Sequence, residues 1–404
     1  MAKFIFLNLP LHAHINPTLP IAQELVARGD EVVYSLTEKY RPAIEATGAR
    51  FHGYQSQTEQ HAQNPAANMA LHMVDECLFV IPQLLESIRA EQPDCIVYDP
   101  MCLSGRFIAQ ILGIPAVISR PTFVAHEQGR RFYQSRGDDA GAAQAFQEAI
   151  QQFCTRYSLP PFNIMDIFTH KEALNIIYIP RSFQVDGAAM GPEYLFVGPS
   201  IGARCEASEF PFEQLNEQFP IVYITLGTVY NNSPTFFQEC FTAFADLPVQ
   251  VIIATGRPLE QLNLGPAPRN FIVRSYVPQL EVLEHVDVFA GHGSMTTIME
   301  VISHGVPMVV IPQATSQEPS ARRVASLGLG LLLEKNTVTS ASLRDAVIQI
   351  LRDASYRARA RQMQDEARLA GGYRRAADAL QDFVGARQGA ADQPGKQDIH
   401  ALSH

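Results

Sequence analysis

The sequence predicts an α/β protein with two Rossmann-like parallel-sheet domains that face each other across a cleft. Short apolar runs alternate with amphipathic stretches along the chain, which is typical of parallel strands covered by helices. This alternation begins at the N-terminus and starts again after residue 220. A polar, glutamate-rich segment at 199–219 separates the two series. We therefore expect two similar domains joined by a linker.

The first series opens with a buried strand at Phe4–Leu9, followed by a loop that contains histidine and proline. A helix is expected at Pro17–Arg28, because its apolar residues recur at the spacing of one helix face. Gly29 stands where helices often end in a left-handed residue. Three further strands are expected, at Glu31–Leu36, Cys95–Tyr98 and Pro115–Ser119.

The second series repeats this pattern. Its expected strands are Ile221–Leu226, Val249–Ala254, Phe271–Tyr276, Val286–Ala290 and Met308–Ile311. Helices at Thr296–Ser303 and Glu318–Ser326 each end near a glycine, and Ser340–Val384 indicates terminal helices. The expected domains are therefore 1–198 and 220–385, with the linker at 199–219. Residues 386–404 hold no large apolar residue before Ile399, which predicts a disordered tail.

Composition excludes several classes of protein. The net charge is −10, which argues against nucleic acid as a partner, because phosphate backbones are bound by clustered Lys and Arg. The N-terminus has no signal-peptide pattern, and no apolar run of about 18 residues predicts a membrane span. The cysteines are scattered without a CxxC pair, which favours reduced thiols and a cytoplasmic location.

A phosphate site is indicated in the second half. The loop Gly291–Thr297 follows an expected strand and precedes a helix, so small residues and free N–H groups lie at a helix N-terminus. Glu300 projects from the same helix face one turn later, where its carboxylate can accept hydrogen bonds from ribose hydroxyls. The alternative is that Thr296 only caps a helix and Glu300 is a solvated charge. Polar or aromatic groups at Tyr276–Gln279 and Pro312–Gln313, which end two other strands, favour the binding site.

A family resemblance follows from these residues. The ordered set resembles the donor-binding box of family 1 glycosyltransferases, which have the GT-B fold, and is most similar to their bacterial macrolide and natural-product branch. About ten positions match in order over roughly forty residues, and the similarity extends over residues 1–385. The matching positions are Tyr276-Val277-Pro278-Gln279, His292-Gly293-Ser294-Met295-Thr296-Thr297, Glu300, Gly305-Val306-Pro307, Pro312 and Gln317.

The resemblance implies a role for each donor-binding position. Tyr276 would stack on uracil or thymine, Val277 would bond the base through its backbone, and Gln279 would reach the ribose. Glu300 would bind the ribose hydroxyls, and Ser316 and Gln317 stand at the sugar. The diphosphate would lie against Thr228, His292, Gly293, Ser294, Thr296 and Thr297.

Three positions depart from the family pattern. Tyr276 replaces a tryptophan and Ser294 replaces a glycine. Ser316 stands where the family commonly has an acid that binds equatorial sugar hydroxyls. Two alternatives follow: the donor is a deoxysugar instead of glucose, or Glu318 takes over the role of the missing acid.

A general base is predicted in the first half, because an alcohol is a weak nucleophile at neutral pH. His14 lies in the loop after the first strand, and Asp99 ends another strand. A loop histidine is by itself more often structural, but the resemblance assigns His14 as the base and Asp99 as the acid that orients it. Ala13 replaces the glycine of the family's pattern, and His12 is the competing candidate base.

The resemblance implies an inverting transfer of a sugar from a UDP- or TDP-sugar to a hydroxyl of a hydrophobic, macrolide-like or polyketide-like small molecule. No cofactor or metal is expected, since the nucleotide sugar is a co-substrate. Candidate acceptor-binding residues in the less regular parts of the first domain are Met73, Phe79, Phe123 and Phe162. The alternatives are a nucleotide-sugar epimerase of the same fold and a non-catalytic nucleotide-sugar-binding partner. A dinucleotide oxidoreductase is disfavoured, because no GxGxxG follows the first strand. The oligomeric state stays open.

Overall fold

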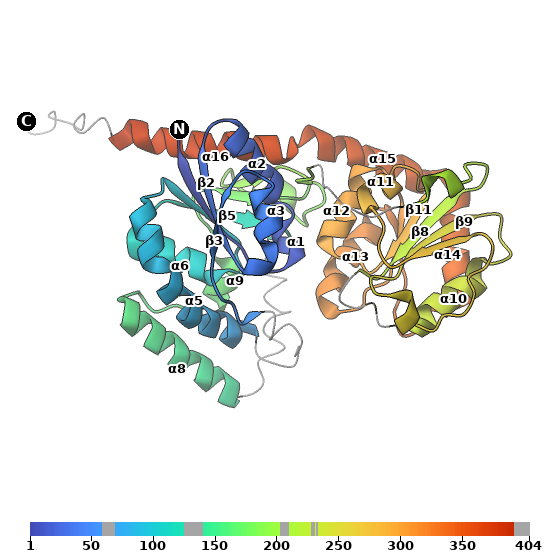
Figure 1. The fold of residues 1–404 in the computed structure, drawn as a ribbon, viewed down its shortest axis with the longest axis horizontal. Helices are drawn as coiled ribbons and strands as arrows, with labels where there is room; N and C mark the ends of the chain where they lie inside the picture. The colour runs from blue at the N-terminus through green and yellow to red at the C-terminus, as the bar shows by residue number, and fades with distance from the viewer. Residues whose placement is uncertain (59–68, 125–139, 203–209, 228–230, 232, 392–404) are drawn as a thin grey trace, which may run out of the picture. The chain divides into compact units, whose positions relative to one another are not determined.

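The computed structural model describes residues 1–58, 69–124, 140–202, 210–227, 231 and 233–391. The chain divides into two compact units, each built around one parallel sheet (Figure 1). Unit 1 comprises Met1–Tyr178, Met190–Gly202 and Gly371–His404. Unit 2 comprises Ile179–Ala189 and Ala203–Ala370. The predicted fold class, two parallel-sheet α/β domains, is confirmed.

The sheet of unit 1 has seven strands in the order β3-β2-β1-β4-β5-β6-β7, and all neighbouring pairs are parallel. The strands are β1 (Lys3–Leu7), β2 (Glu31–Leu36), β3 (Arg50–Gly53), β4 (Cys95–Tyr98), β5 (Ala116–Arg120), β6 (Asn175–Ile177) and β7 (Tyr194–Phe196). Alternate residues of β1 enter two different apolar cores, one on each face of the sheet. This explains why its sequence is an unbroken apolar run.

Helices cover both faces of this sheet (Figure 1). One core contains residues of α5, α6 and α8, and the other contains residues of α2 and α16. The helices of unit 1 are α1 (His12–Ile15), α2 (Leu19–Ala27), α3 (Arg41–Glu45), α5 (Met69–Glu91), α6 (Leu103–Leu112), α8 (Ala140–Tyr157), α9 (Ile164–Thr169) and α16 (Gly372–Ala391).

The sheet of unit 2 has six parallel strands in the order β10-β9-β8-β11-β12-β13. The strands are β8 (Ile221–Thr225), β9 (Gln250–Ala254), β10 (Phe271–Arg274), β11 (Val288–Gly291), β12 (Met308–Val310) and β13 (Gly330–Leu332). The helices are α10 (Pro234–Phe244), α11 (Gln279–Leu283), α12 (Met295–Ser303), α13 (Glu318–Ser326), α14 (Ser340–Arg352) and α15 (Ala354–Leu369).

The C-terminal segment differs from its prediction in two ways. Helix α16 belongs to unit 1, because Ala376, Ala377 and Leu380 pack into the core beside β1 and α2, whereas the sequence placed residues up to 385 in the second domain. The helix also continues to Ala391, so residues 386–391 are not a disordered tail. Gln388 holds this end of the helix by donating a hydrogen bond to Asp94. Residues 392–404 lie outside the described residues.

Smaller expectations have mixed outcomes. Gly29 has a φ of +91° directly after α2, as expected of a left-handed helix end. The loop after β1 contains a short helix, α1, that the sequence did not predict. The five described cysteines are free and buried, and Cys205 lies outside the described residues. None of the helices in the described ranges is long and apolar enough to span a bilayer.

Both sheets change direction of strand order at one point. In unit 1 this point lies between β1 and β4, and in unit 2 it lies between β8 and β11. Ligands of open α/β sheets bind beyond the carboxyl ends of the strands at such a point. The loops after these four strands are therefore where the site is expected.

Candidate active site

His14 and Asp99 form a partly buried hydrogen-bonded pair in unit 1. The Nδ1 atom of His14 lies 2.6 Å from Oδ2 of Asp99, and the Asp99 side chain is fully buried while that of His14 is 18% exposed. The other carboxylate oxygen of Asp99 accepts a hydrogen bond from the backbone N–H of Met101 at 2.7 Å. Two hydrogen bonds thus hold Asp99 in place. Because Nδ1 of His14 is bound to Asp99, Nε2 is the ring nitrogen that can accept a proton from a substrate.

The sheet brings these two residues together. Strands β1 and β4 are parallel neighbours with Leu7 opposite Tyr98, so Asp99 and the loop that carries His14 leave the same edge of the sheet. The backbone N–H of Asp99 donates to the carbonyl of Leu7, which extends the pairing by one residue. His14 then lies on α1, whose first turn begins after Leu11. This edge is the point where the strand order reverses.

A buried polar cluster lies beneath the His14 loop, and the sequence analysis missed it. Nδ2 of Asn8 donates to Oγ1 of Thr18 at 3.0 Å and to the hydroxyl of Tyr34 at 2.5 Å. The Thr18 hydroxyl in turn donates to the carbonyl of Ile15, next to His14. The available signal was Asn8, a polar residue directly after the apolar strand β1. The cluster fixes both ends of the loop that carries the histidine.

The environment of His14 shifts its pKa. Burial by itself lowers the pKa, but the negative charge of Asp99 and the hydrogen bond to it raise the value, and the net result is above the ordinary 6.5. His12 is in a different environment: its exposed ring packs edge-on against Tyr40, with ring centroids 5.0 Å apart. Of the two candidate histidines, His14 is the one paired with the carboxylate.

The predicted phosphate loop of unit 2 ends in a capped helix. Ser294 is the N-cap of α12, and its hydroxyl accepts a hydrogen bond from the backbone N–H of Thr297. Gly293 has a φ of +82°, and a Cβ there would lie 2.4 Å from Cγ1 of Val310. Only glycine fits this turn without strain. Thr296 is partly exposed and Thr297 buried in the first turn of the helix.

His292 precedes this turn and is almost completely buried. Burial lowers its pKa to about 4, while a hydrogen bond with the backbone of Thr225 acts in the opposite direction. Its Nδ1 atom has no hydrogen-bond partner among the described residues. Buried polar atoms rarely stay unpaired, so this nitrogen marks a place where a ligand can bind.

Glu300 and Gln279 contact each other directly. Nε2 of Gln279 donates to Oε2 of Glu300, and Oε1 of Gln279 accepts a 3.1 Å hydrogen bond from the hydroxyl of Tyr223. The Glu300 side chain is only 2% exposed. The two residues with predicted ribose roles are therefore brought together, and the Gln279 amide group bridges Glu300 and Tyr223.

The remaining donor residues lie on loops of the same unit. Tyr276 is 58% exposed, and its hydroxyl donates to the carbonyl of Gly256 at 3.1 Å. Val277 is buried. Tyr276 follows β10, which is separated from β11 by β9 and β8, whereas β11 and β12 are neighbours in the sheet. Thr228 lies outside the described residues.

The residues predicted to contact the sugar lie on a short turn before α13. Oε1 of Gln317 accepts hydrogen bonds from the backbone N–H groups of Gln313 and Ala314. Ser316 is exposed beside it. Glu318 pairs with Arg322 on the same helix, with charged atoms 3.5 Å apart.

Two further residues connect the loops of unit 2, and the sequence analysis did not include them. Nδ2 of Asn231 donates to the carbonyls of Gly227 and Gly256, which follow β8 and β9. The buried Ser320 donates to the carbonyl of Gly293 at 2.7 Å. This bond fixes the turn at Gly293 and Ser294, here called the phosphate turn after its predicted role, against α13. Neither residue lies in a recognisable motif, so only the folded structure reveals it.

The four predicted acceptor residues lie in unit 1. Met73 is buried in the apolar core, and Phe79 is half-buried against that core. Phe162 packs on the same core and also lines a cavity, described below. Phe123 is half-buried after β5. Their roles toward an acceptor stay a prediction.

Comparison with known proteins gives the family. The C-terminal domain of erythromycin biosynthesis protein CIII-like proteins matches residues 238–371. NDP-glycosyltransferase YjiC of Bacillus subtilis (strain 168) is 34% identical over 386 residues, which cover 94% of this chain and 96% of that protein. The chain belongs to the family 1 natural-product glycosyltransferases. It is a nucleotide-sugar-dependent glycosyltransferase, as the sequence resemblance implied.

Other members of this family are similar over nearly the whole chain. Demethyllactenocin mycarosyltransferase of Streptomyces fradiae is 30% identical, with coverage of 95% of this chain and 87% of that protein. The crystal structure of the calicheamicin glycosyltransferase CalG4 has a TM-score of 0.84 at 29% identity, with coverage of 95% and 98%. The GT-B fold of this glycosyltransferase is thereby confirmed.

Proposed function

We propose that this glycosyltransferase moves a sugar from a UDP- or TDP-sugar to a hydroxyl of a hydrophobic small molecule, with inversion at the anomeric carbon. His14 is the general base, and Asp99 orients it. The observation that carries the proposal is the His14–Asp99 hydrogen bond at the point of unit 1 where the strand order reverses. A buried carboxylate bound to Nδ1 selects the tautomer in which Nε2 is free to accept a proton.

The transfer is a single displacement. The acceptor oxygen forms a bond to the anomeric carbon while its proton moves to Nε2 of His14. The bond from the anomeric carbon to the diphosphate oxygen breaks, and the nucleoside diphosphate leaves with both electrons. Asp99 stabilises the imidazolium that forms, and such base assistance contributes about 10²–10⁴-fold.

The leaving diphosphate gains negative charge as that bond breaks. In unit 2 the N-terminus of α12 offers backbone N–H groups and the positive end of the helix dipole. The unpaired Nδ1 of His292 and the hydroxyls of Thr296 and Thr297 are further candidates to bind the phosphate oxygens. We assign the stabilisation of the leaving group to these residues, with no metal.

The donor and acceptor classes rest on the family and its named members. One relative is named an NDP-glycosyltransferase, and two others act on demethyllactenocin and calicheamicin according to their names. These names support a nucleoside diphosphate donor and a natural-product acceptor. The exposed Ser316 and the pairing of Glu318 with Arg322 favour a sugar with fewer hydroxyl contacts, such as a deoxysugar.

The test is transfer itself. Purified protein is incubated with UDP- and TDP-linked glucose and deoxysugars against a panel of macrolide, polyketide and phenolic acceptors, and products are detected by mass spectrometry. The His14→Ala variant should lose at least about a hundredfold in rate, while its matched control His12→Ala keeps the rate. Equal transfer by His14→Ala and wild type would remove the base assignment. A change of the donor sugar without acceptor would instead indicate an epimerase.

A further inference from the structure

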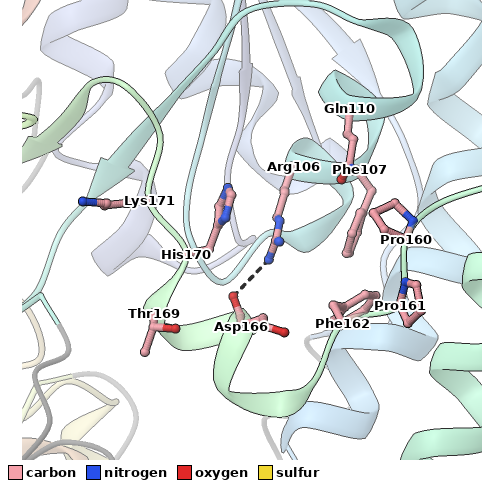
Figure 2. Close-up of a pocket in the computed structure, with 10 residues that line it drawn as sticks. All are labelled: Arg106, Phe107, Gln110, Pro160, Pro161, Phe162, Asp166, Thr169, His170 and Lys171. Carbon is pink, nitrogen blue, oxygen red and sulfur yellow. Dashed lines mark hydrogen bonds between the residues drawn. The ribbon is translucent and has the colours of Figure 1, made fainter.

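A cavity of about 360 Å³ lies in unit 1, away from the His14–Asp99 pair. It is formed by Arg106, Phe107 and Gln110 of α6 and by the segment 160–171 that contains α9. Figure 2 shows Arg106 in its centre, with His170 on one side and the rings of Phe107 and Phe162 on the other. Of its lining residues, only Phe162 was predicted from the sequence to contact the acceptor.

Arg106 is a half-buried cation with few partners. Nη1 donates one hydrogen bond to the backbone carbonyl of Asp166 at 3.0 Å, drawn as the dashed line in Figure 2. Its buried Nε has no hydrogen-bond partner, and Arg106 forms no ion pair within the described part of the chain. A guanidinium has five N–H donors, so most of its capacity is unused. Burial lowers the pKa of Arg106, which means that its charge is poorly solvated.

The nearby carboxylates are occupied by other donors. Glu172 accepts hydrogen bonds from the hydroxyl of Tyr98 at 2.8 Å and interacts with Nε2 of His170 at 3.0 Å. The Asp166 side chain accepts from the backbone N–H of Asn163 at 2.8 Å and so caps its own turn. Neither carboxylate neutralises Arg106 by direct contact. An anion from outside the chain would meet an unpaired guanidinium.

The other wall of the cavity is apolar and stiff. The Arg106 guanidinium lies 5.2 Å from the ring centroid of Phe107 and 6.0 Å from that of Phe162. Pro160 and Pro161 complete this wall, and proline has little conformational freedom to lose on binding. The volume is at the lower end of the range of about 300–1,000 Å³ for small-molecule sites. It suits one or two rings.

We propose that this cavity binds a small organic monoanion with an aromatic ring, whose carboxylate pairs with the guanidinium of Arg106. The ring packs against Phe162 and the two prolines. Guanidinium and carboxylate match as a bidentate pair, which supplies both orientation and charge selectivity. The lining of this cavity includes neither His14 nor Asp99, and binding there requires no nucleotide sugar, so the proposal does not depend on the proposed function.

The first test uses wild-type protein and two probes of equal shape. Binding of 1-naphthoate and of its neutral analogue 1-naphthamide is measured by ligand-observed NMR titration, without nucleotide sugar. A hydrogen-bonded charge pair predicts that the anion binds about tenfold more tightly or better. Equal dissociation constants for the two probes, or no binding of either, would overturn the proposal.

Variants then locate the binding. Arg106→Met removes the guanidinium charge but keeps a long aliphatic side chain. It should bring the affinity for naphthoate down to that for naphthamide. Phe162→Ala should weaken both probes by a similar factor. Arg156→Met, which removes an exposed cation beside Tyr157 in the same unit, is the matched control and should change neither. If the preference for the anion survives in Arg106→Met, the site lies elsewhere and the proposal is wrong. Should Arg106→Met fail to fold, Arg106→Lys must show a reduced preference.

Discussion

Nδ1 of His14 lies 2.6 Å from Oδ2 of Asp99, although the two residues are 85 positions apart in the chain. The contact exists because β1 and β4 are neighbours in the sheet and both end at the same edge. Asp99 is also anchored by the N–H of Met101, so its position does not depend on the histidine. Asp99 is therefore placed to orient the ring of His14, and the two residues can be tested by separate substitutions.

The Asp99→Asn variant should lower kcat by about a hundredfold or more while KM for the nucleotide sugar stays within a few-fold. An amide cannot stabilise the imidazolium that forms, and it does not select the productive tautomer. Steady-state kinetics with a fixed acceptor measures both constants. The matched control is Asp94→Asn, because Asp94 lies at the opposite end of β4 and accepts a hydrogen bond from the N–H of Lys3. Comparable losses in both variants would mean that the sheet, and not the base, is affected.

The pH profile should report His14. The base must be unprotonated, so kcat/KM rises with pH through a pKa that Asp99 holds above the ordinary 6.5. In Asp99→Asn this rise should move to lower pH, because the raising influence of the carboxylate is gone. The same raised pKa stabilises the fold fully below about pH 6.5 and loses that contribution as the pH rises through the folded-state value. A rise of kcat/KM that does not move in the variant would show that another group titrates.

Binding of the nucleoside diphosphate should be accompanied by proton uptake at His292. In the free protein its pKa is about 4, so the ring is neutral near pH 6 and its unpaired Nδ1 faces no donor or acceptor among the described residues. A diphosphate next to the ring favours the charged form and raises the pKa. Calorimetric titration of UDP at pH 6 in buffers of different ionisation enthalpy measures the uptake. The terminal phosphate of UDP also titrates near pH 6, so the His292→Gln variant is the control for proton exchange by the ligand alone. It should take up fewer protons than wild type, and equal proton exchange in the two proteins would contradict the prediction.

Glu300→Gln should weaken UDP binding by about tenfold or more but leave the binding of inorganic pyrophosphate unchanged. The carboxylate accepts a hydrogen bond from Gln279, and the ribose hydroxyls would have to join or replace that contact. Pyrophosphate has no ribose, so it tests the phosphate loop alone. Tyr223→Phe removes only the hydroxyl behind Gln279 and should have a smaller effect. Equal losses for both ligands would place Glu300 in the support of the phosphate loop.

The local sequence pattern was sufficient to predict much of the fold. It also identified candidate site residues in the loop after β1 and in the loop after β11. Apolar runs such as Phe4–Leu7 identify buried strands, and a polar group directly after a strand identifies a candidate site residue. The direct contact of His14 with Asp99 could not be derived this way, because strand order is a long-range property. Sequence reasoning implied it only through the family resemblance.

Other features depend on packing that no local pattern contains. Helix α16 packs on unit 1 through the small residues Ala376 and Ala377, which look unremarkable in the sequence. The contact of Gln279 with Glu300 joins a helix after β10 to the helix after β11, across strands that are not neighbours. Thr18 and Tyr34 belong to the polar cluster beneath the His14 loop only because the fold places both against Asn8.

The phosphate turn should be intolerant of any side chain at Gly293. Its φ of +82° is strained for other residues, and an added Cβ would lie 2.4 Å from Cγ1 of Val310. Gly293→Ala should therefore destabilise the protein by about 1–3 kcal/mol, measured by urea unfolding. Gly389→Ala is the matched control: this helical glycine has open space around it, and alanine there should be neutral or stabilising by up to about 1 kcal/mol.

The double variant Gly293→Ala with Val310→Ala relieves the clash but not the backbone strain. This double variant should regain only part of the free energy of unfolding that Gly293→Ala loses. The backbone strain remains, and the loss of the buried Val310 methyl groups lowers the stability further. Unfolding of Gly293→Ala at the wild-type urea midpoint would show that the turn can change its conformation freely.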